Sequence, residues 1–265
     1  MRSGGPSRRS RPSGLTSSSW WTTATASLRR RESPRCVPAA LLHHTAQAEW
    51  TGHAPWQAVG ADLIMGSLIK NPGGTIVPCG GYVAGRADLV ANASARLSAP
   101  GIGQDAGATS GEWRRLLFQG LFQAPGMVGE AVKGSHLIAA VMSAEGYEVA
   151  PAVGVSRHDI ITSVVLRSPA RQVAFCAAIQ RACPIGAYVR PEPAATPGYA
   201  SEVIFANGTF IEGSTAELSA DGPLRPPYVV YCQGGTHWTH WALALESAVE
   251  GLRATDAPDA ADWQT

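Results

Sequence analysis

The sequence predicts an α/β fold in which helices alternate with strands. Between residues 86 and 144, apolar side chains recur at the spacing of a helix. From residue 147 onward the apolar runs become short and rich in Val and Ile, as in strands, with a helical segment between them. This alternation predicts helices packed on a mixed sheet.

The first strand is predicted at Ala61–Met65, an apolar run that suits a buried strand. Lys70 follows it, three residues after Ser67. The turn Asn71-Pro72-Gly73-Gly74 comes next. Its glycines predict a backbone that closely approaches a small neighbour.

The helical part is predicted to hold three helices. The first covers Arg86–Ser98, with Leu and Val on one face. Two more are expected at Glu112–Gln123 and Gly126–Ala144, divided at Pro125 because proline can open a helix.

The β-rich part begins with strands expected within Tyr147–Val153 and Ile160–Leu166. A helix is predicted at Pro169–Cys183. The segment Glu202–Leu218 contains Asn207-Gly208, a hairpin dipeptide between two β-rich runs. Thr236–Leu252 is predicted to form the last helix.

The composition excludes several classes of function. A net charge of +1 favours neither a nucleic-acid partner nor a membrane surface. No apolar run reaches the roughly 18 residues of a membrane span. The five cysteines form no C-x-x-C pair, which indicates reduced thiols in an intracellular, cytoplasmic protein.

Lys70 is the residue with the strongest chemical interpretation. An amine in a water-poor pocket has a lowered pKa and can attack an aldehyde. The Ser67 hydroxyl and the glycine backbone can hold an anion, such as a cofactor phosphate. The alternative is a surface lysine that follows a core strand.

Several long motifs, in order, identify a family: GADLIMGSLIKNPGG, GGYVAGRADLV, RLSAPGIG, QGLFQAPGMVGEAVKG, PEPAATPGY and FIEGSTAELSADGPLRPPY. From Val59 to His240 the chain resembles the aluminium-resistance-type branch of pyridoxal-phosphate enzymes, related to cystathionine beta-lyase and methionine gamma-lyase. The resemblance implies a fold-type I pyridoxal-phosphate-dependent transferase-like fold, truncated at its N-terminus. It also implies a carbon–sulfur lyase for an amino-acid substrate and a homo-oligomer, either dimer or tetramer.

By this resemblance Lys70 is the internal aldimine lysine and Ser67 contacts the cofactor phosphate. Enzymes of this fold hold the substrate carboxylate with an arginine, whose fork matches two oxygens. Arg225 is the candidate, since its apolar and proline neighbours would desolvate it. The alternative for Arg225 is an ion pair with Glu217 or Asp221.

Other polar and aromatic side chains have structural interpretations. Tyr82 and Tyr199 could line a pocket, although tyrosines in such loops more often serve packing. His237 and His240 lack a carboxylate at metal-ligand spacing, so we expect surface histidines and no metal site.

The resemblance divides the chain into four parts. Residues 1–56 match nothing in the family, 57–145 form the C-terminal part of the large cofactor-binding domain, 146–255 form the small α/β domain, and 256–265 form a tail. The first part has eight arginines up to Arg35 against one acid, Glu32, and lacks apolar periodicity.

Three hypotheses account for residues 1–56. The first is a transit peptide, which would direct the protein to an organelle. The second is a disordered basic tail. The third is a reading-frame or splicing error: in another frame the codons of Trp20–Ser27 encode Val-Asp and allow Asn-Cys-Tyr-Gly-Glu, a family motif found upstream of the cofactor lysine.

The functional prediction is a carbon–sulfur lyase in an incomplete and inactive form, because the family holds the cofactor ring with residues from a preceding half. The alternative is a non-catalytic remnant or partner subunit that pairs with a full-length paralogue. A phosphate-binding regulatory module is a third hypothesis, based on the glycine-rich turns.

Overall fold

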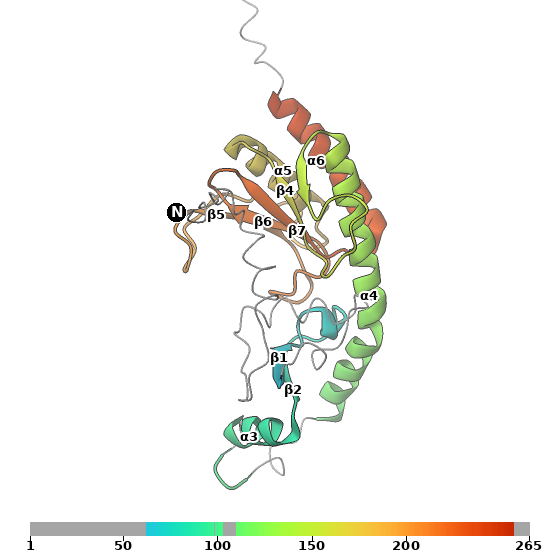
Figure 1. Cartoon of the computed structure of the whole chain (residues 1–265), viewed down its shortest axis with the longest axis vertical. Helices are drawn as coiled ribbons and strands as arrows, with labels where there is room; N and C mark the ends of the chain where they lie inside the picture. The colour runs from blue at the N-terminus through green and yellow to red at the C-terminus, as the bar shows by residue number, and fades with distance from the viewer. Residues whose placement is uncertain (1–61, 98, 103–109, 257–265) are drawn as a thin grey trace, which may run out of the picture. The chain divides into compact units, whose positions relative to one another are not determined.

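The computed structural model describes residues 62–97, 99–102 and 110–256, so the predicted segment 1–56 and nearly all of the tail lie outside it. An antiparallel sheet of five strands has the order β3-β4-β7-β6-β5 (Figure 1). The strands are β3 (Glu148–Ala150), β4 (Thr162–Val165), β5 (Val203–Asn207), β6 (Ser219–Pro223) and β7 (Val229–Gln233). All of these pairings are antiparallel, so the predicted mixed sheet is wrong.

One face of this sheet is covered by helices. Successive strand residues point to opposite faces, and Val230 and Cys232 of β7 belong to the apolar core. The helices that complete this core are α4 (Gly111–Ala144), α5 (Pro169–Ala182) and α6 (Trp238–Asp256). Their large buried side chains include Ile138, Met142, Phe175, Ile179, Trp241, Leu245 and Leu252. Each such side chain contributes roughly 1.5–3 kcal/mol, so this layer is the main source of hydrophobic stabilisation.

The opposite face of the sheet, which we call the second face, carries a row of side chains across neighbouring strands. Phe205 of β5 lies opposite Asp221 of β6. Asp221 lies opposite Tyr231 of β7, and Tyr231 lies opposite Ser163 of β4. The second face therefore presents polar groups where the first face presents the apolar core.

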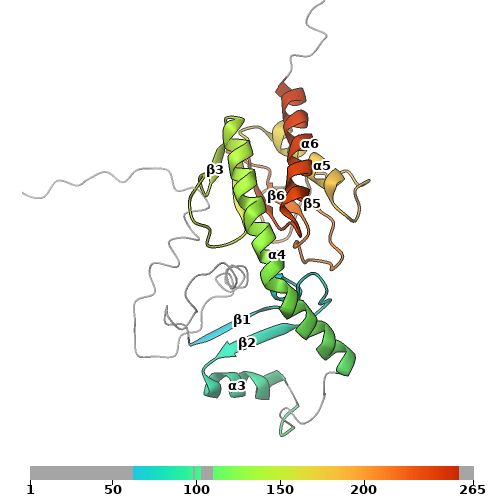
Figure 2. The ribbon, with the colours of Figure 1, turned by 90° about the vertical axis from the view of Figure 1, so that its right-hand side faces the viewer.

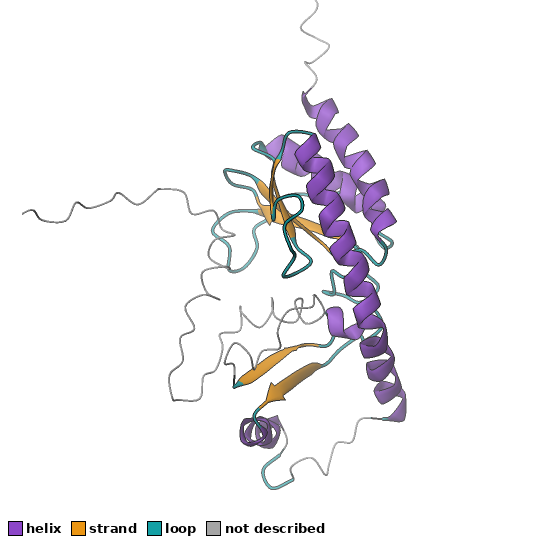
Figure 3. Ribbon diagram, turned by 45° about the vertical axis from the view of Figure 1, so that its right-hand side comes forward, coloured by secondary structure: helices purple, strands orange, loops and turns teal. Residues whose placement is uncertain are grey.

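The first predicted strand forms, with two differences. The observed β1 (Leu63–Ser67) begins two residues later than expected and is half-buried rather than buried. It pairs antiparallel with β2 (Gly81–Gly85) in a two-stranded sheet, the lower pair of orange arrows in Figure 3. A two-stranded sheet has no central strand. Among the described residues β1 therefore pairs with β2 alone and stays partly exposed.

The helix α4 is continuous, whereas two helices divided at Pro125 were predicted. Figure 2 shows it running without a break. A proline inside a helix removes one hydrogen bond and costs about 3 kcal/mol. Ala124 and Val128, on either side of Pro125, are both buried. Packing on both sides of Pro125 thus offsets the cost of the proline, and the two predicted segments form one continuous helix.

The turn after Lys70 lies against α4, as its glycines predicted. It forms the 3-10 helix η2 (Asn71–Gly73), which is buried and followed by Gly74 in the left-handed conformation. A Cβ at Gly74 would lie 2.5 Å from the Gly120 carbonyl oxygen, and one at Gly120 would lie 2.7 Å from the Val77 side chain. Only glycine allows this approach, so the pair fixes where the lysine turn sits on the helix.

The predicted hairpin at Asn207-Gly208 is wrong. The strand β5 ends at Asn207, but its partner β6 begins only at Ser219. A side chain at Gly208 would collide with the Ile185 carbonyl oxygen, so this glycine serves a close approach and not a tight turn. The residues between Gly208 and Leu218 form a loop that becomes part of the candidate site.

The remaining helices match their predictions closely. The helix α3 covers Ala87–Leu97, although none of its residues is buried. The observed α5 and α6 lie within a few residues of the predicted segments. No helix in the described ranges is long and apolar enough to cross a membrane.

Substituting Gly120 tests the contact between the lysine turn and α4. Gly120→Ala should lower the free energy of unfolding by about 1–3 kcal/mol, because the added methyl group overpacks against Gly73 and Val77. Gly129→Ala, in the same helix with open space around it, should raise stability by about 0.5–1 kcal/mol. Urea denaturation measures both, and equal effects would contradict the packing.

Candidate functional site

Lys70 lies in the turn between β1 and η2 and reaches across to a different part of the chain. Its Nζ donates a hydrogen bond to the carbonyl oxygen of Gly213, in the loop that precedes β6. Burial lowers the pKa of the Lys70 amine, and the Asp221 carboxylate acts in the opposite direction. An amine with a lowered pKa is the form that reacts with carbonyl compounds.

Asp221 is the acidic group whose charge raises the pKa of this amine against the effect of burial. Its place on the second face of the sheet buries most of the carboxylate. Burial raises the pKa of Asp221 to about 6, against the opposing effects of its backbone hydrogen bond and of Lys70. Lys70 and Asp221 thus affect each other's pKa although they are far apart in the sequence.

The loop of residues 208–218, which contains Gly213, is held by a hydrogen bond within it and by another from Gly235. The Ser214 amide donates to the Ile211 carbonyl at 3.0 Å, and the Gly235 amide donates to the Ala216 carbonyl at 2.9 Å. Thr215 has a φ of 60°, in the left-handed region that few non-glycine residues adopt. Such strain persists only where the surroundings enforce it, so the loop is a defined structure.

Ser67 is the last residue of β1 and opens the turn that contains Lys70. Its Oγ accepts a hydrogen bond from the Ile69 amide at 3.2 Å. This bond uses a lone pair of the hydroxyl and leaves its proton able to reach an anion. The structure thus places Ser67 and Lys70 on one short turn.

Arg225 lies in the turn between β6 and β7 and is exposed, which corrects the expectation that its apolar neighbours desolvate it. Neither predicted ion pair exists among the described residues. Glu217 is buried and accepts a hydrogen bond from the Phe210 amide at 3.4 Å, while the charge that acts on Asp221 is that of Lys70. The guanidinium is therefore available, and its role in binding a carboxylate stays a prediction.

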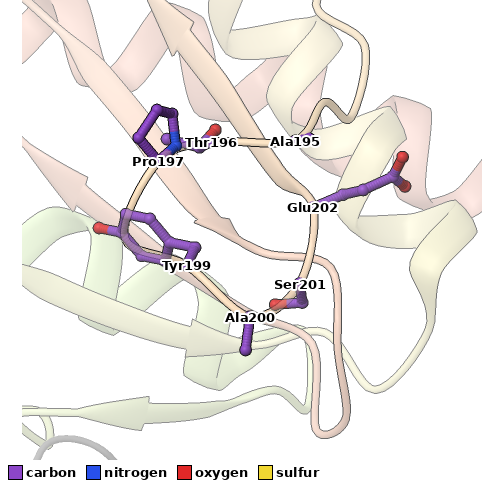
Figure 4. A pocket seen from close by; sticks show the side chains of 7 residues that line it. All are labelled: Ala195, Thr196, Pro197, Tyr199, Ala200, Ser201 and Glu202. Atoms are coloured by element: carbon purple, nitrogen blue, oxygen red, sulfur yellow. The ribbon is translucent and has the colours of Figure 1, made fainter.

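The two tyrosines occupy different settings. A Cβ at Gly66 would lie 2.7 Å from the Tyr82 ring, so Tyr82 packs over the strand opposite. Tyr199 lines a shallow surface hollow of about 500 Å³ that is formed by residues 195–202 (Figure 4). In Figure 4 the Glu202 carboxylate points away from Tyr199. Because this hollow includes neither Lys70 nor Arg225, it is separate from the candidate site.

The histidines behave as structural groups, and the described ranges hold no cluster that could bind a metal ion. The His240 Nε2 lies 2.6 Å from the Ala182 carbonyl oxygen, and the His237 Nε2 lies 3.7 Å from a Glu130 oxygen. The four cysteines of the described residues are free thiols, namely Cys79, Cys176, Cys183 and Cys232.

Sequence reasoning missed Gly213 and named Asp221 only as an alternative partner for Arg225. A signal for Asp221 existed: in Ser219-Ala220-Asp221-Gly222, polar and small residues alternate with the period of a strand. The segment was not recognised because Asp, Gly and Pro are depleted in strands.

Known proteins resemble this chain over most of its length. The sequence model of the methionine gamma-lyase family matches residues 45–253. The Bacillus subtilis protein YnbB is 47% identical over 194 residues, which cover 73% of this chain and 46% of YnbB. A 33.9 kDa protein of Lactobacillus delbrueckii is 43% identical over 200 residues, covering 76% of this chain and 65% of that protein.

Solved structures of related proteins also match this chain. A carbon–sulfur lyase involved in aluminium resistance from Clostridium novyi superposes with a TM-score of 0.71 at 42% identity, covering 78% of this chain and 48% of that protein. A candidate cystathionine beta-lyase involved in aluminium resistance from Listeria innocua gives 0.70 at 46% identity, covering 73% and 47%. The chain thus spans about half the length of most of these relatives.

Asp221→Asn should remove a pH dependence of stability. The pKa of folded Asp221 is raised from 3.8 to about 6. Between these values the unfolded chain releases a proton that the folded protein retains. This group therefore lowers the wild-type free energy of unfolding as pH rises through the interval, and the loss persists above it.

Asparagine has no such loss, so the variant should be the more stable protein at neutral pH. Urea denaturation at a series of pH values measures the difference. Asp88→Asn is the control, because Asp88 is exposed and paired with Arg86. A difference between wild type and Asp221→Asn that does not change with pH would contradict the burial of this carboxylate.

Proposed function

Because the chain belongs to the methionine gamma-lyase family, we propose that it carries the lysine-bearing part of a pyridoxal-phosphate-dependent carbon–sulfur lyase that acts on an amino acid. The names of the Clostridium and Listeria relatives support this chemistry. The observation that carries the proposal is the setting of Lys70, whose half-buried amine donates to the Gly213 carbonyl and has its pKa lowered by burial.

The residues present fit two parts of this cofactor. A half-buried amine of lowered pKa suits an aldehyde, which it attacks in its neutral form. The Ser67 hydroxyl, with its proton not used in the Ile69 bond, suits a phosphate oxygen. When bound, pyridoxal phosphate would supply an electron sink for negative charge at the substrate carbon.

In this proposal the three candidate site residues have distinct roles. Lys70 Nζ would hold the cofactor aldehyde, and the same amine would move the α-proton of the substrate. Ser67 Oγ orients the phosphate. Arg225 binds the substrate carboxylate through its exposed guanidinium, whose fork geometry matches two oxygens.

We further propose a fold-type I architecture for the complete protein. Residues 57–145 would be the C-terminal part of the large domain and residues 146–255 the small domain. Electron-sink chemistry also requires a protonated ring nitrogen and a fixed ring plane. Lys70, Ser67 and Arg225 supply neither, so in this proposal the 265-residue chain alone is an incomplete and inactive form.

The purified chain tests its incompleteness. After incubation with pyridoxal phosphate and gel filtration, the wild type should retain no visible absorbance, and Lys70→Ala should look the same. A stable yellow wild-type protein that borohydride bleaches, beside a colourless Lys70→Ala variant, would overturn this part of the proposal.

A chimera tests the lyase chemistry itself. The N-terminal half of the Listeria innocua relative, joined to residues 62–256 of this chain, should bind pyridoxal phosphate and release a keto acid from cystathionine. The sequence has only two lysines, Lys70 and Lys133, which gives a matched control. Lys70→Ala should abolish both properties, while Lys133→Ala should leave them unchanged. Cofactor binding that survives Lys70→Ala would refute the assignment.

A second candidate function is favoured by an apolar surface on α4. Phe118 and Phe122 lie one helical turn apart and are 72% and 86% exposed. Exposed aromatic pairs of this kind are uncommon outside interaction sites. Since the chain spans 46% of the relative YnbB, we propose a full-length family member as the partner, with this chain as a non-catalytic subunit of the oligomer.

Co-expression with a full-length relative tests this second function. The tagged chain should retain the relative through affinity purification, and Phe118→Asp combined with Phe122→Asp should abolish the retention. Leu243→Asp, at an exposed position of α6, is the control and should have no effect. Retention of the relative by the double variant would contradict the α4 interface.

A further inference from the structure

The loop of residues 208–218 receives the Lys70 amine at the carbonyl of Gly213. The Ser214 amide donates to the Ile211 carbonyl at 3.0 Å, which closes a four-residue turn. Gly213 is the third residue of this turn and has a φ of 76°, a conformation that glycine adopts without strain. The direction of its carbonyl, and with it the position of the bound amine, therefore depends on how the ends of the loop are held.

Gln180 of α5 holds the beginning of the loop. Its side chain is buried, and its amide binds both backbone groups of Asn207, the last residue of β5. The Gln180 Oε1 accepts from the Asn207 N–H at 2.9 Å, and the Nε2 donates to the Asn207 carbonyl at 2.7 Å. Since β5 lies at one edge of the sheet, this side chain pairs with backbone groups that a further strand would otherwise bind.

The same glutamine also fixes the direction in which the chain leaves β5. Its Nε2 donates to the Gly186 carbonyl at 3.1 Å, in addition to its bond to Asn207. The next residue after β5 is Gly208, where a side chain would collide with the Ile185 carbonyl oxygen. The start of the loop is thus held against the segment that follows α5, because one buried amide binds both.

Glu217 joins the end of the loop to its beginning. It is buried, and its Oε1 accepts from the Phe210 amide at 3.4 Å. Its Oε2 has no hydrogen-bond partner among the described residues, so replacing that oxygen by an amide nitrogen removes no hydrogen bond. Between these two ends, a Cβ at Gly213 would lie 3.7 Å from the Ile69 side chain. The loop therefore contacts the lysine turn directly beside the bond from Lys70.

We propose that Gln180 and Glu217 are positioning residues for Lys70, because they fix the loop whose Gly213 carbonyl holds the amine. Each acts through backbone groups of the loop. Their use in catalysis rests on the proposed function, in which the amine must meet an aldehyde in one orientation. The positioning itself is a property of the chain without cofactor, so it can be tested separately.

Gln172 provides a matched control, eight residues earlier in the same helix. It is also buried, and its Nε2 donates to the Pro223 carbonyl at 3.3 Å and to the Val229 carbonyl at 3.4 Å. Pro223 is the last residue of β6, whereas the loop precedes the first. Loss of the Gln172 amide should therefore destabilise the sheet without altering the loop.

NMR relaxation of the lysine side chains measures the positioning. Protein labelled with ¹³C at the lysine Cε gives two signals, since Lys70 and Lys133 are the only lysines, and Lys70→Ala assigns them. Lys133 has an exposed side chain and serves as the mobile reference. In the wild type the order parameter of Lys70 should exceed that of Lys133.

Gln180→Met keeps the length of the side chain and removes the hydrogen bonds of its amide. The order parameter of Lys70 should fall to that of Lys133 in this variant, whereas Gln172→Met should keep the wild-type value. Urea denaturation compares the stability that the two variants lose, which separates positioning from general destabilisation. An equal loss of Lys70 order in both variants would overturn the proposal.

Two variants of Glu217 give an independent test that holds even if Gln180→Met does not fold. Glu217→Gln keeps an acceptor for the Phe210 amide and should retain the wild-type order of Lys70. Glu217→Met has no acceptor and should lower it. Unchanged Lys70 order in Glu217→Met would overturn the proposal, and so would a wild-type Lys70 as mobile as Lys133. A chimera that binds no cofactor would leave these results standing, so the two proposals fail separately.

Discussion

The close approach of two backbones is the constraint on which the candidate site depends. Gly120 of α4 and the Gly73-Gly74 pair of the lysine turn lie so near each other that neither side tolerates a methyl group. The turn is thereby held against a long helix, and the same helix contributes Ile138 and Met142 to the sheet core. Lys70 therefore extends from a supported turn, although its own side chain is only half-buried.

The sheet gives the site its electrostatic character because its two faces have different roles. One face is filled by apolar side chains of three helices, which stabilise the fold. The other face carries Asp221, and burial raises the pKa of this carboxyl although Lys70 acts in the opposite direction. A buried carboxylate contributes little to stability, so the apolar face remains the main source of stabilisation.

The relation to the methionine gamma-lyase family supports the proposal that the described residues hold only part of a site. The match covers residues 45–253, while the chain spans 48% of the Clostridium novyi relative. The described residues provide the amine of Lys70, the hydroxyl of Ser67 and the exposed guanidinium of Arg225. An exposed pair of phenylalanines on α4 adds a surface that a longer or associated chain would cover. The proposed lyase function and the proposed role in assembly rest on these features.

The sequence by itself determined the family, the nature of the lysine turn and most helices. These depend on local signals: a long motif, a glycine pair, and apolar periodicity within one element. Tertiary structure decided the rest. Pro125 lies inside one helix because packing on both sides outweighs a local preference. Ser219–Pro223 is a strand because β5 and β7 pair with it, despite its poor propensity. The charge of Asp221 acts on Lys70 only once the chain is folded, since two residues 151 positions apart carry no local signal of this effect.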